Sequence, residues 1–120
     1  MEVVILVAGR GTRFNGYLPK SLVKFGEETL LEKTIKSVRA VGAEIPIRVI
    51  TGYEAGQISE KIRGLGDKNI DCIFNENFEA DQNIISAKIG LESSSSDTLV
   101  LEGDCVYNSE TIEQFFSYLG

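Results

Sequence analysis

Histidine is absent from this 120-residue chain. Its absence excludes catalytic triads that depend on histidine, histidine-ligated metal sites and the commonest general acid or base of enzymes. Any chemistry carried by the chain must therefore use carboxylates, lysine, arginine, backbone amides or a bound metal ion.

The small number of cysteines, the lack of a long apolar segment and the net negative charge exclude further classes of protein. We expect each of the two cysteines, Cys72 and Cys105, to be a small buried apolar residue in a reducing compartment rather than half of a disulfide. No segment approaches the roughly 20 apolar residues of a membrane-spanning helix, and the opening MEVVILVA is too short for a signal peptide and contains an acid. A formal net charge of −6 argues against a general nucleic-acid binder. We therefore expect a cytoplasmic protein that binds neither nucleic acid nor membrane.

Strand-like and helix-like segments alternate along the chain. A capping-box pattern at Thr29 and Glu32 predicts a helix from that point to about Val41, with Gly42 as its stop. Asn108 or Ser109 can cap a last helix in the same way. Strands are predicted over 3–8, 46–51, 69–74 and 97–103. Two more helices are predicted: one over about 55–63, closed by Gly64 and Gly66, and one that begins at Asp81.

This order, β-α-β-α-β-α-β-α with short connections, predicts an α/β fold. We expect a three-layer α/β/α arrangement around a mainly parallel, Rossmann-like sheet. In such sheets ligands bind at the carboxyl ends of the strands, near the point where the strand order reverses. Two loops are therefore candidates for a site: the loop after the first strand (9–28) and the loop after the fourth strand, from Gly103 on.

The loop after the first strand has the features of an anion site. Residues 3–26 carry four basic residues and no acidic one in an otherwise acidic chain, which indicates a focused positive charge. The loop fails the dinucleotide pattern G-x-G-x-x-G, because Phe14 stands at the third glycine position. It also fails the Walker A pattern, because Pro19, which lacks an N–H, replaces the glycine before Lys20. A plain glycine turn with incidental surface lysines is the alternative.

The segment LVAGRGTRFNGYLPKSLVKF (6–25) resembles the signature loop of nucleotidyltransferases with a GT-A-like Rossmann fold, commonly L-x-A-G-x-G-x-R followed by P-K. These enzymes join a nucleoside triphosphate to a phosphorylated sugar, polyol or alkyl alcohol and release pyrophosphate. The resemblance continues through LLEKTIKSVRAVG, VITGY, NIISAKIGL and LVLEGD, so it covers nearly the whole chain. It implies the same fold here, and transfer of a nucleoside monophosphate from an NTP to a phosphorylated acceptor.

The resemblance also assigns roles to residues of the loop. Arg13 is suited to a forked grip on the β- and γ-phosphate oxygens that become the leaving pyrophosphate. Lys20, next to Pro19, would hold the α-phosphate, where charge builds up in the transition state. These two are the candidate catalytic residues. The residues implied to contact the nucleotide, at a place where glycines allow close approach of the backbone, are Leu6, Ala8, Gly9 and Gly11.

Three more residues complete the candidate site. Asp104 follows the fourth strand, where the family binds a Mg²⁺ ion that bridges triphosphate oxygens, and a carboxylate suits that cation. A structural aspartate that caps or turns the chain is the alternative. Asn83 and Ser86 lie at i and i+3 on a predicted helix, so they can face one nucleobase together. Similar enzymes that use CTP place polar groups here, which favours CTP over UTP or GTP, although a chance helix face is the competing explanation.

Family members are usually about twice this length or more, and their acceptor-binding residues come from the later part of the fold. We therefore expect residues 1–120 to be the nucleotide-binding portion of a nucleotidyltransferase domain whose acceptor-binding portion is absent. Glu110 and Glu113 lie on a predicted helix and are expected at the surface, so neither supplies a second metal ligand. An exposed sheet edge would favour self-association into a homo-oligomer.

Two rival hypotheses remain open from the sequence. The first is a nucleotide-sugar-dependent GT-A glycosyltransferase, in which Glu102 and Asp104 would form an acidic-x-acidic metal motif. The second is a non-catalytic nucleotide-binding or assembly subunit built on the same fold. The presence together of Gly9, Gly11, Arg13, Lys20 and Asp104 argues against this second hypothesis.

Overall fold

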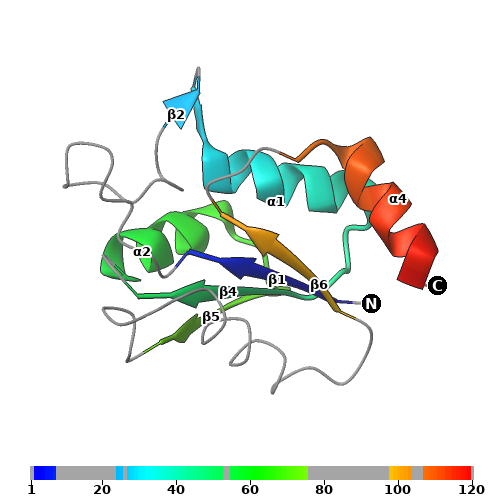
Figure 1. Ribbon diagram of the computed structural model, residues 1–120. Coiled ribbons are helices and arrows are strands. Elements are labelled where there is room, and N and C mark those ends of the chain that lie inside the picture. Colours follow the sequence, from blue (N-terminus) through cyan, green and yellow to red (C-terminus); the bar gives the residue numbers. More distant parts are fainter. Residues whose placement is uncertain are drawn as a thin grey trace.

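A four-stranded parallel sheet forms the centre of the computed structural model. The structure describes residues 2–7, 24–25, 27–52, 55–75, 98–103 and 107–119. The strands of the sheet lie in the order β5-β4-β1-β6 (Figure 1). Their bounds are β1 (Glu2–Leu6), β4 (Ile47–Thr51), β5 (Ile70–Phe74) and β6 (Thr98–Glu102). All the predicted strands are therefore present and parallel, which confirms the α/β fold.

Three described helices lie on one face of this sheet (Figure 1). They are α1 (Leu30–Val41), α2 (Ala55–Leu65) and α4 (Ser109–Leu119). Alternate residues of each strand point to this face, and removing their apolar surface from water is the main favourable term in packing the layers together. The buried cluster between the layers consists of Val3, Ile5, Val7, Leu31, Ile35, Val38, Ile47, Val49, Ile58, Ile62, Ile70, Leu101 and Ile112.

The opposite face of the sheet carries a second, smaller cluster. Val4, Leu6 and Ile50 are buried there, and Ile73 packs against them. The central strand β1 is therefore apolar on both faces, as expected for a parallel strand covered on both sides. The predicted helix that starts at Asp81 falls outside the described residues, so the second helical layer stays a prediction.

The two ends of α1 follow the sequence signals, but for different physical reasons. The Thr29 hydroxyl accepts a hydrogen bond from the Glu32 N–H at 3.1 Å, and the Glu32 carboxylate accepts one from the Thr29 N–H at 3.0 Å, which confirms the capping box. At the other end, Gly42 has an extended backbone with φ −163°, which any residue can adopt. A Cβ at Gly42 would lie 2.8 Å from Cδ1 of Ile45. Close packing of the Ile45 side chain, and not a left-handed backbone, therefore favours glycine here.

The structure shows which of the residues suggested by the sequence end helix α2 and which residue caps helix α4. Helix α2 runs through Gly64 and ends before Gly66, whose φ of 68° lies in the left-handed region. Asn108 is the N-cap of α4, because its side-chain oxygen accepts from the Thr111 N–H at 2.8 Å. None of the described helices is both long and apolar enough to cross a membrane.

Two features differ from what the sequence led us to expect. Part of the segment predicted as loop is a short antiparallel pair of strands, β2 (Lys24–Phe25) and β3 (Glu28–Thr29). Cys72 is exposed and not buried. It lies on β5, an outer strand of the described sheet, of which Ile70 alone is buried. Cys105 lies outside the described residues.

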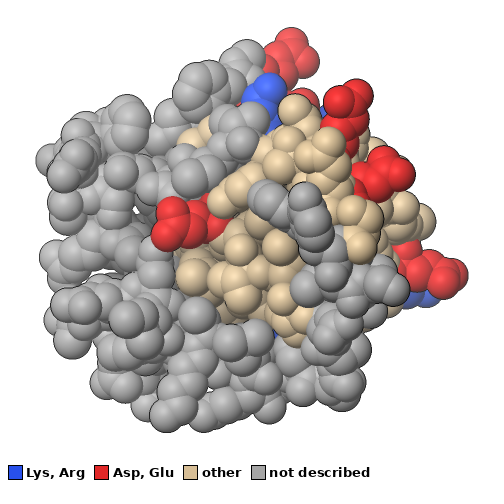
Figure 2. Space-filling model, turned by 45° about the vertical axis from the view of Figure 1, so that its right-hand side comes forward, with Lys and Arg blue, Asp and Glu red and all other residues tan. Residues whose placement is uncertain are grey.

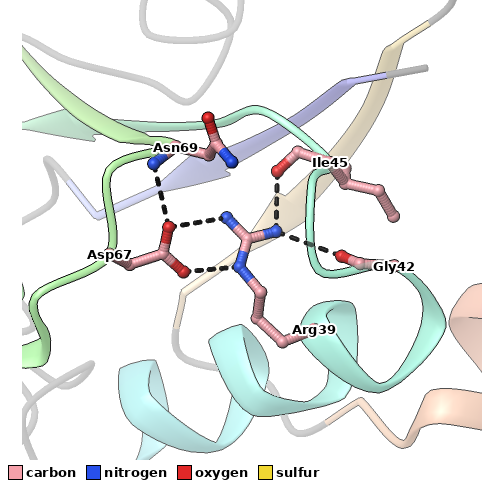
Figure 3. A network of polar contacts seen from close by, with 5 residues as sticks. All are labelled: Arg39, Gly42, Ile45, Asp67 and Asn69. Carbon is pink, nitrogen blue, oxygen red and sulfur yellow. Dashed lines mark hydrogen bonds and ion pairs between the residues drawn. The ribbon is translucent and has the colours of Figure 1, made fainter.

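A network of hydrogen bonds joins residues near the amino-terminal ends of β4 and β5 (Figure 3). Arg39, near the end of α1, donates hydrogen bonds to both carboxylate oxygens of Asp67, at 2.5 and 3.2 Å. It also donates to the carbonyls of Gly42 and Ile45, at 3.2 and 2.7 Å. Asp67 in turn accepts from the Asn69 N–H at 2.9 Å. The network therefore joins the end of α1 to the segments that enter β4 and β5.

Candidate functional site

The carboxyl ends of β1 and β6 lie side by side, at the place where the strand order reverses. The chain passes from β1 to β4 and β5 in one direction and then returns to β6 on the other side of β1. Leu6 is in register with Glu102, and the Gly103 N–H donates to the Leu6 carbonyl at 2.9 Å. On the other side, the Val7 N–H donates to the Ile50 carbonyl at 3.0 Å. The chain leaving β1 is thus held between β4 and β6, at the point where parallel sheets bind ligands.

Both candidate loops start at this reversal point. The basic loop (9–28) begins two positions after Val7, and Asp104 directly follows Gly103. The hydrogen bond between Gly103 and Leu6 therefore brings together the starting points of two loops that lie far apart in the sequence. The two candidate segments therefore follow neighbouring strand ends of the sheet.

Among the predicted site residues, Leu6 lies within the described part of the chain. Its side chain is 7% exposed and packs with Val4 and Ile50, so it belongs to the core. Its predicted contact with the nucleotide stays a prediction. The remaining predicted site residues lie outside the described residues, and their roles stay predictions too: Ala8, Gly9, Gly11, Arg13, Lys20, Asn83, Ser86 and Asp104.

The far end of the basic loop is anchored at the start of α1. Strands β2 and β3 pair so that Lys24 lies opposite Thr29, which then caps the helix. Glu32, the reciprocal member of the cap, also lies 3.5 Å from the ammonium group of Lys61 on α2. The Thr29 backbone N–H, helped by the Thr29 hydroxyl and Lys61, lowers the pKa of Glu32. Glu32 therefore stays ionised and keeps its capping role at neutral pH.

Tyr107 connects the end of β6 to the start of α4. Its hydroxyl accepts a hydrogen bond from the Glu102 N–H at 3.1 Å, and its carbonyl accepts one from the Ser37 hydroxyl at 2.6 Å. Its side chain packs against the main core. Sequence reasoning missed this residue, because a single tyrosine between a strand and a helix matches no pattern. The contact with Ser37 of α1, 70 positions away, is what distinguishes it.

The charge of the described surface is predominantly acidic. Asp and Glu side chains outnumber Lys and Arg on the face shown in Figure 2. Glu110 and Glu113 are exposed beside a shallow hollow on α4, which confirms that they are surface residues. No cluster of three or more His, Cys, Asp or Glu side chains that could hold a metal occurs within the described ranges. The candidate ligand Asp104 lies outside the described residues. A carboxylate is a ligand that suits a hard cation such as Mg²⁺, and its role as a metal ligand stays a prediction.

Comparison with protein families matches residues 3–120 to the MobA-like NTP transferase domain. The chain belongs to this family. The resemblance inferred from the signature loop is therefore confirmed, and it extends over nearly the whole chain.

Curated relatives of this NTP transferase domain include proteins named bifunctional protein GlmU. The protein of Streptococcus equi subsp. zooepidemicus is 32% identical over 116 residues, which cover 96% of this chain and 24% of the relative. The protein of Streptococcus pyogenes is 36% identical over 102 residues, which cover 84% of this chain and 23% of the relative. The chain thus spans about a quarter of the length of the curated relatives it matches.

Solved structures share the fold of this NTP transferase domain. A nucleotidyl transferase from Methanothermobacter aligns with a TM-score of 0.80 and 23% identity, over 98% of this chain and 56% of that chain. The CTP:phosphocholine cytidylyltransferase of Streptococcus pneumoniae aligns with a TM-score of 0.75 and 24% identity, over 91% and 49%. At such identities the likeness establishes a nucleotidyltransferase type of Rossmann-like fold.

Proposed function

We propose that this domain transfers a nucleoside monophosphate, by preference CMP, from an NTP to the phosphate of a phosphorylated sugar, polyol or alkyl alcohol, with release of pyrophosphate. The observation that carries the proposal is the family match over residues 3–120. The reversal point supports it, because the start of the basic loop and the start of the segment with Asp104 are tied together there by the bond from Gly103 to Leu6.

The candidate residues suit this transfer without a general base. An oxygen of the acceptor phosphate, already ionised at neutral pH, attacks the α-phosphorus, and the bond from that phosphorus to the pyrophosphate oxygen breaks. Lys20 stabilises the charge on the α-phosphate, and Arg13 holds the leaving pyrophosphate. Asp104 would hold Mg²⁺, which when bound supplies positive charge beside the triphosphate. Positioning and neutralisation of charge then account for catalysis by a chain that has no histidine.

The preference for CTP rests on Asn83 and Ser86, whose spacing on a helix allows both side chains to face one base. Two of the solved neighbours are named as CTP-dependent transferases. Another is named as a putative glucose-1-phosphate thymidylyltransferase. Proteins with this fold are therefore named for more than one base, so the nucleotide that this domain prefers has to be measured.

The test is a panel of four NTPs against phosphosugars, phosphopolyols and phosphocholine, with the intact protein, Mg²⁺ and pyrophosphate as the measured product. We expect pyrophosphate release, fastest with CTP. Lys20→Ala and Asp104→Ala should each lower the rate about 10²–10³-fold, the usual effect of removing one charge-stabilising group. Lys68→Ala is the control, because Lys68 is exposed in the turn before β5, at the opposite edge of the sheet, and its loss should leave the rate unchanged.

The panel also separates the rival functions. A nucleoside diphosphate, released from a nucleotide-sugar donor, would identify a glycosyltransferase. If no NTP raises the melting temperature and no pyrophosphate appears, the domain is a non-catalytic subunit. Pyrophosphate release that is unchanged in Lys20→Ala and Asp104→Ala would overturn the residue assignment while leaving the activity in place.

A further inference from the structure

Strand β5 forms one edge of the described sheet, beside β4 (Figure 1), and Ile70 alone among its residues is buried. We propose that two copies of the protein form a symmetric dimer in which their β5 strands pair antiparallel. Cys72 lies at the two-fold axis of this dimer, and Phe74 of each copy packs against Leu65 of the other. The inference is independent of the proposed activity, because it uses none of the candidate site residues.

The backbone of β5 presents alternate residues to its outer flank. The Asn69 carbonyl accepts a hydrogen bond from β4 at 2.8 Å, and the Asn75 N–H donates to β4 at 2.8 Å, so the odd-numbered residues face β4. The N–H and carbonyl groups of Ile70, Cys72 and Phe74 therefore point away from β4, to a side where no described strand pairs with β5. Such an edge is a template for a further strand unless charges, proline or a bulge blunt it. Strand β5 contains one charged residue and no proline.

The register of the strand pair follows from the two-fold symmetry. In an antiparallel pair around a two-fold axis, one residue lies opposite its own copy. A pair centred on Cys72 uses all five residues of β5, and the two Cys72 residues exchange two N–H to carbonyl bonds. A pair centred on Asp71 would place two carboxylates directly opposite each other, which is destabilising. A pair centred on Ile73 would overlap over only three residues of each β5 strand.

Two exposed apolar side chains lie at opposite ends of this flank. Leu65 and Phe74 are 39% and 52% exposed, and they are two of the three large apolar side chains exposed in the described part of the chain. Leu65 is the last residue of α2, which packs on β4 and β5, and it lies five positions before the start of β5. Phe74 is the last residue of β5. The two side chains therefore belong to the two ends of one strand.

Both side chains lie on the helix side of the sheet. Leu65 continues the stripe of Ile58 and Ile62, which are part of the main core, and Phe74 alternates along β5 with the core residue Ile70. Antiparallel pairing puts the end of one β5 strand beside the start of the other. Phe74 of each copy therefore meets the end of the flank where the second copy has Leu65. The symmetry makes this contact twice.

The charge of α2 and β5 permits two copies to approach each other. The whole chain has a formal net charge of −6, but residues 55–75 contain three basic and three acidic residues and are neutral. These residues are Lys61, Arg63, Lys68, Glu60, Asp67 and Asp71. Two copies that met through the acidic remainder of the chain would repel each other, whereas this neutral segment brings no net charge into the interface.

The experiment measures the mass of the intact protein by sedimentation, at concentrations up to about 100 µM. We expect a reversible equilibrium between monomer and dimer with a dissociation constant in the micromolar range, since a five-residue strand pair makes a small interface. Phe74→Ser and Leu65→Ser should each raise the dissociation constant about tenfold, because each removes an apolar contact that occurs twice. The double variant should lose little more than either single variant, since the two side chains contact each other.

Val100→Ser is the control for these variants. Val100 is 36% exposed and lies on β6, at the opposite edge of the described sheet. Its replacement removes a comparable exposed apolar side chain and should leave the dissociation constant unchanged. Far-ultraviolet circular dichroism checks that each variant keeps its fold, which we expect because all three side chains are exposed.

Cross-linking tests the register. Opposite residues of a hydrogen-bonded antiparallel pair have Cα atoms about 5.5 Å apart, a separation that a disulfide can span. Diamide, which accepts the two electrons and two protons of a pair of thiols, should therefore link the two Cys72 residues in mildly alkaline buffer, where thiolate forms. Cys72→Ser should abolish the covalent dimer, and Cys105→Ser should leave it unchanged.

Several outcomes would overturn the inference. One is a protein that stays monomeric at every concentration, and another is a dimer that neither Phe74→Ser nor Leu65→Ser weakens. A dimer that diamide does not link through Cys72 would contradict the register. Assemblies that grow beyond the dimer and disappear in Phe74→Ser would show that β5 recruits strands without two-fold closure, which contradicts the symmetry.

Discussion

Replacing Asp67 by asparagine should destabilise the protein more than the loss of a surface ion pair would. Asp67 receives two hydrogen bonds from the guanidinium of Arg39, at 2.5 and 3.2 Å, and one from the Asn69 N–H at 2.9 Å (Figure 3). An asparagine keeps one acceptor oxygen, carries no charge and directs an NH₂ group at the donors of Arg39. Asp67→Asn therefore loses the forked, charge-assisted pair while the size of the side chain is retained.

The expected loss of unfolding free energy depends on how exposed the ion pair between Arg39 and Asp67 is. The side chains of Arg39 and Asp67 are 16% and 21% exposed, which lies between a dry pair and a surface pair. Breaking a fully buried pair costs about 3–5 kcal/mol, and exposed pairs contribute about 0–1 kcal/mol. Arg39 keeps the carbonyls of Gly42 and Ile45 as acceptors, so part of its solvation is retained. We expect a loss of about 2 kcal/mol at neutral pH, between these limits.

The assay is urea unfolding of the chain at pH 7, followed by circular dichroism. A loss of about 2 kcal/mol lowers the unfolding midpoint by about 1 M urea for a domain of this size. Glu28→Gln is the control, because Glu28 pairs with the well-exposed Lys36 and its replacement should cause no measurable shift. A midpoint of Asp67→Asn equal to that of the control would show that the paired hydrogen bonds between Arg39 and Asp67 do not stabilise the protein.

The loss of unfolding free energy caused by Asp67→Asn should depend on pH. The Arg39 guanidinium, followed by the Asn69 N–H, holds the pKa of Asp67 below its ordinary value of 3.8. A lowered pKa in the folded state means that the stabilisation is complete above the unfolded value and is lost as the pH falls through the folded value. The difference in unfolding free energy between wild type and Asp67→Asn should therefore stay constant from about pH 5 to 7 and shrink below about pH 4. A difference that grew in acid would contradict this assignment.

Two further predictions concern the helices α1 and α2. Gly42→Ala should lower the unfolding free energy by about 1–3 kcal/mol, because the new methyl group would lie 2.8 Å from Ile45. Gly64→Ala, with nothing within 4 Å, should raise it by about 0.5–1 kcal/mol through helix propensity; changes of the same sign in urea unfolding would contradict the pair. Thr29→Ala removes the acceptor of the Glu32 N–H and should cost about 1 kcal/mol. A melting temperature within about 1 °C of wild type would show that the cap does not limit stability.

Local signals in the sequence predicted local structure well. The capping box at Thr29 and Glu32 depends on residues three positions apart, so the pattern itself contains both partners of both hydrogen bonds. The apolar run of β1 predicted a strand buried on both faces for a similar reason, because every residue of the run contributes to the signal. The signature loop predicted the family correctly, since its glycines, arginine and Pro-Lys pair form a specific combination.

Features that depend on distant partners were not predictable in this way. Gly42 was read as a helix stop, but the reason for glycine is the packing of Ile45, which depends on how the chain turns into β4. Cys72 was expected in the core, but its strand lies at the outside of the described sheet, and strand order is not encoded in the pattern of a single strand. The hydrogen bond from Ser37 to the Tyr107 carbonyl joins residues 70 positions apart, and no spacing rule connects two such residues.

By itself, the sequence determined the four strands of the parallel sheet, the three described helices, the family and the residues to be tested as the site, because hydrophobic period, caps and the signature loop are all short-range patterns. Only the tertiary structure decided that β6 returns to the side of β1 opposite β4 and that the Gly103 N–H meets the Leu6 carbonyl. The physical reason is that strand neighbours are selected by the packing of whole helices and sheet faces, which no single segment contains. That choice of neighbours places the start of the basic loop beside the residue that precedes Asp104.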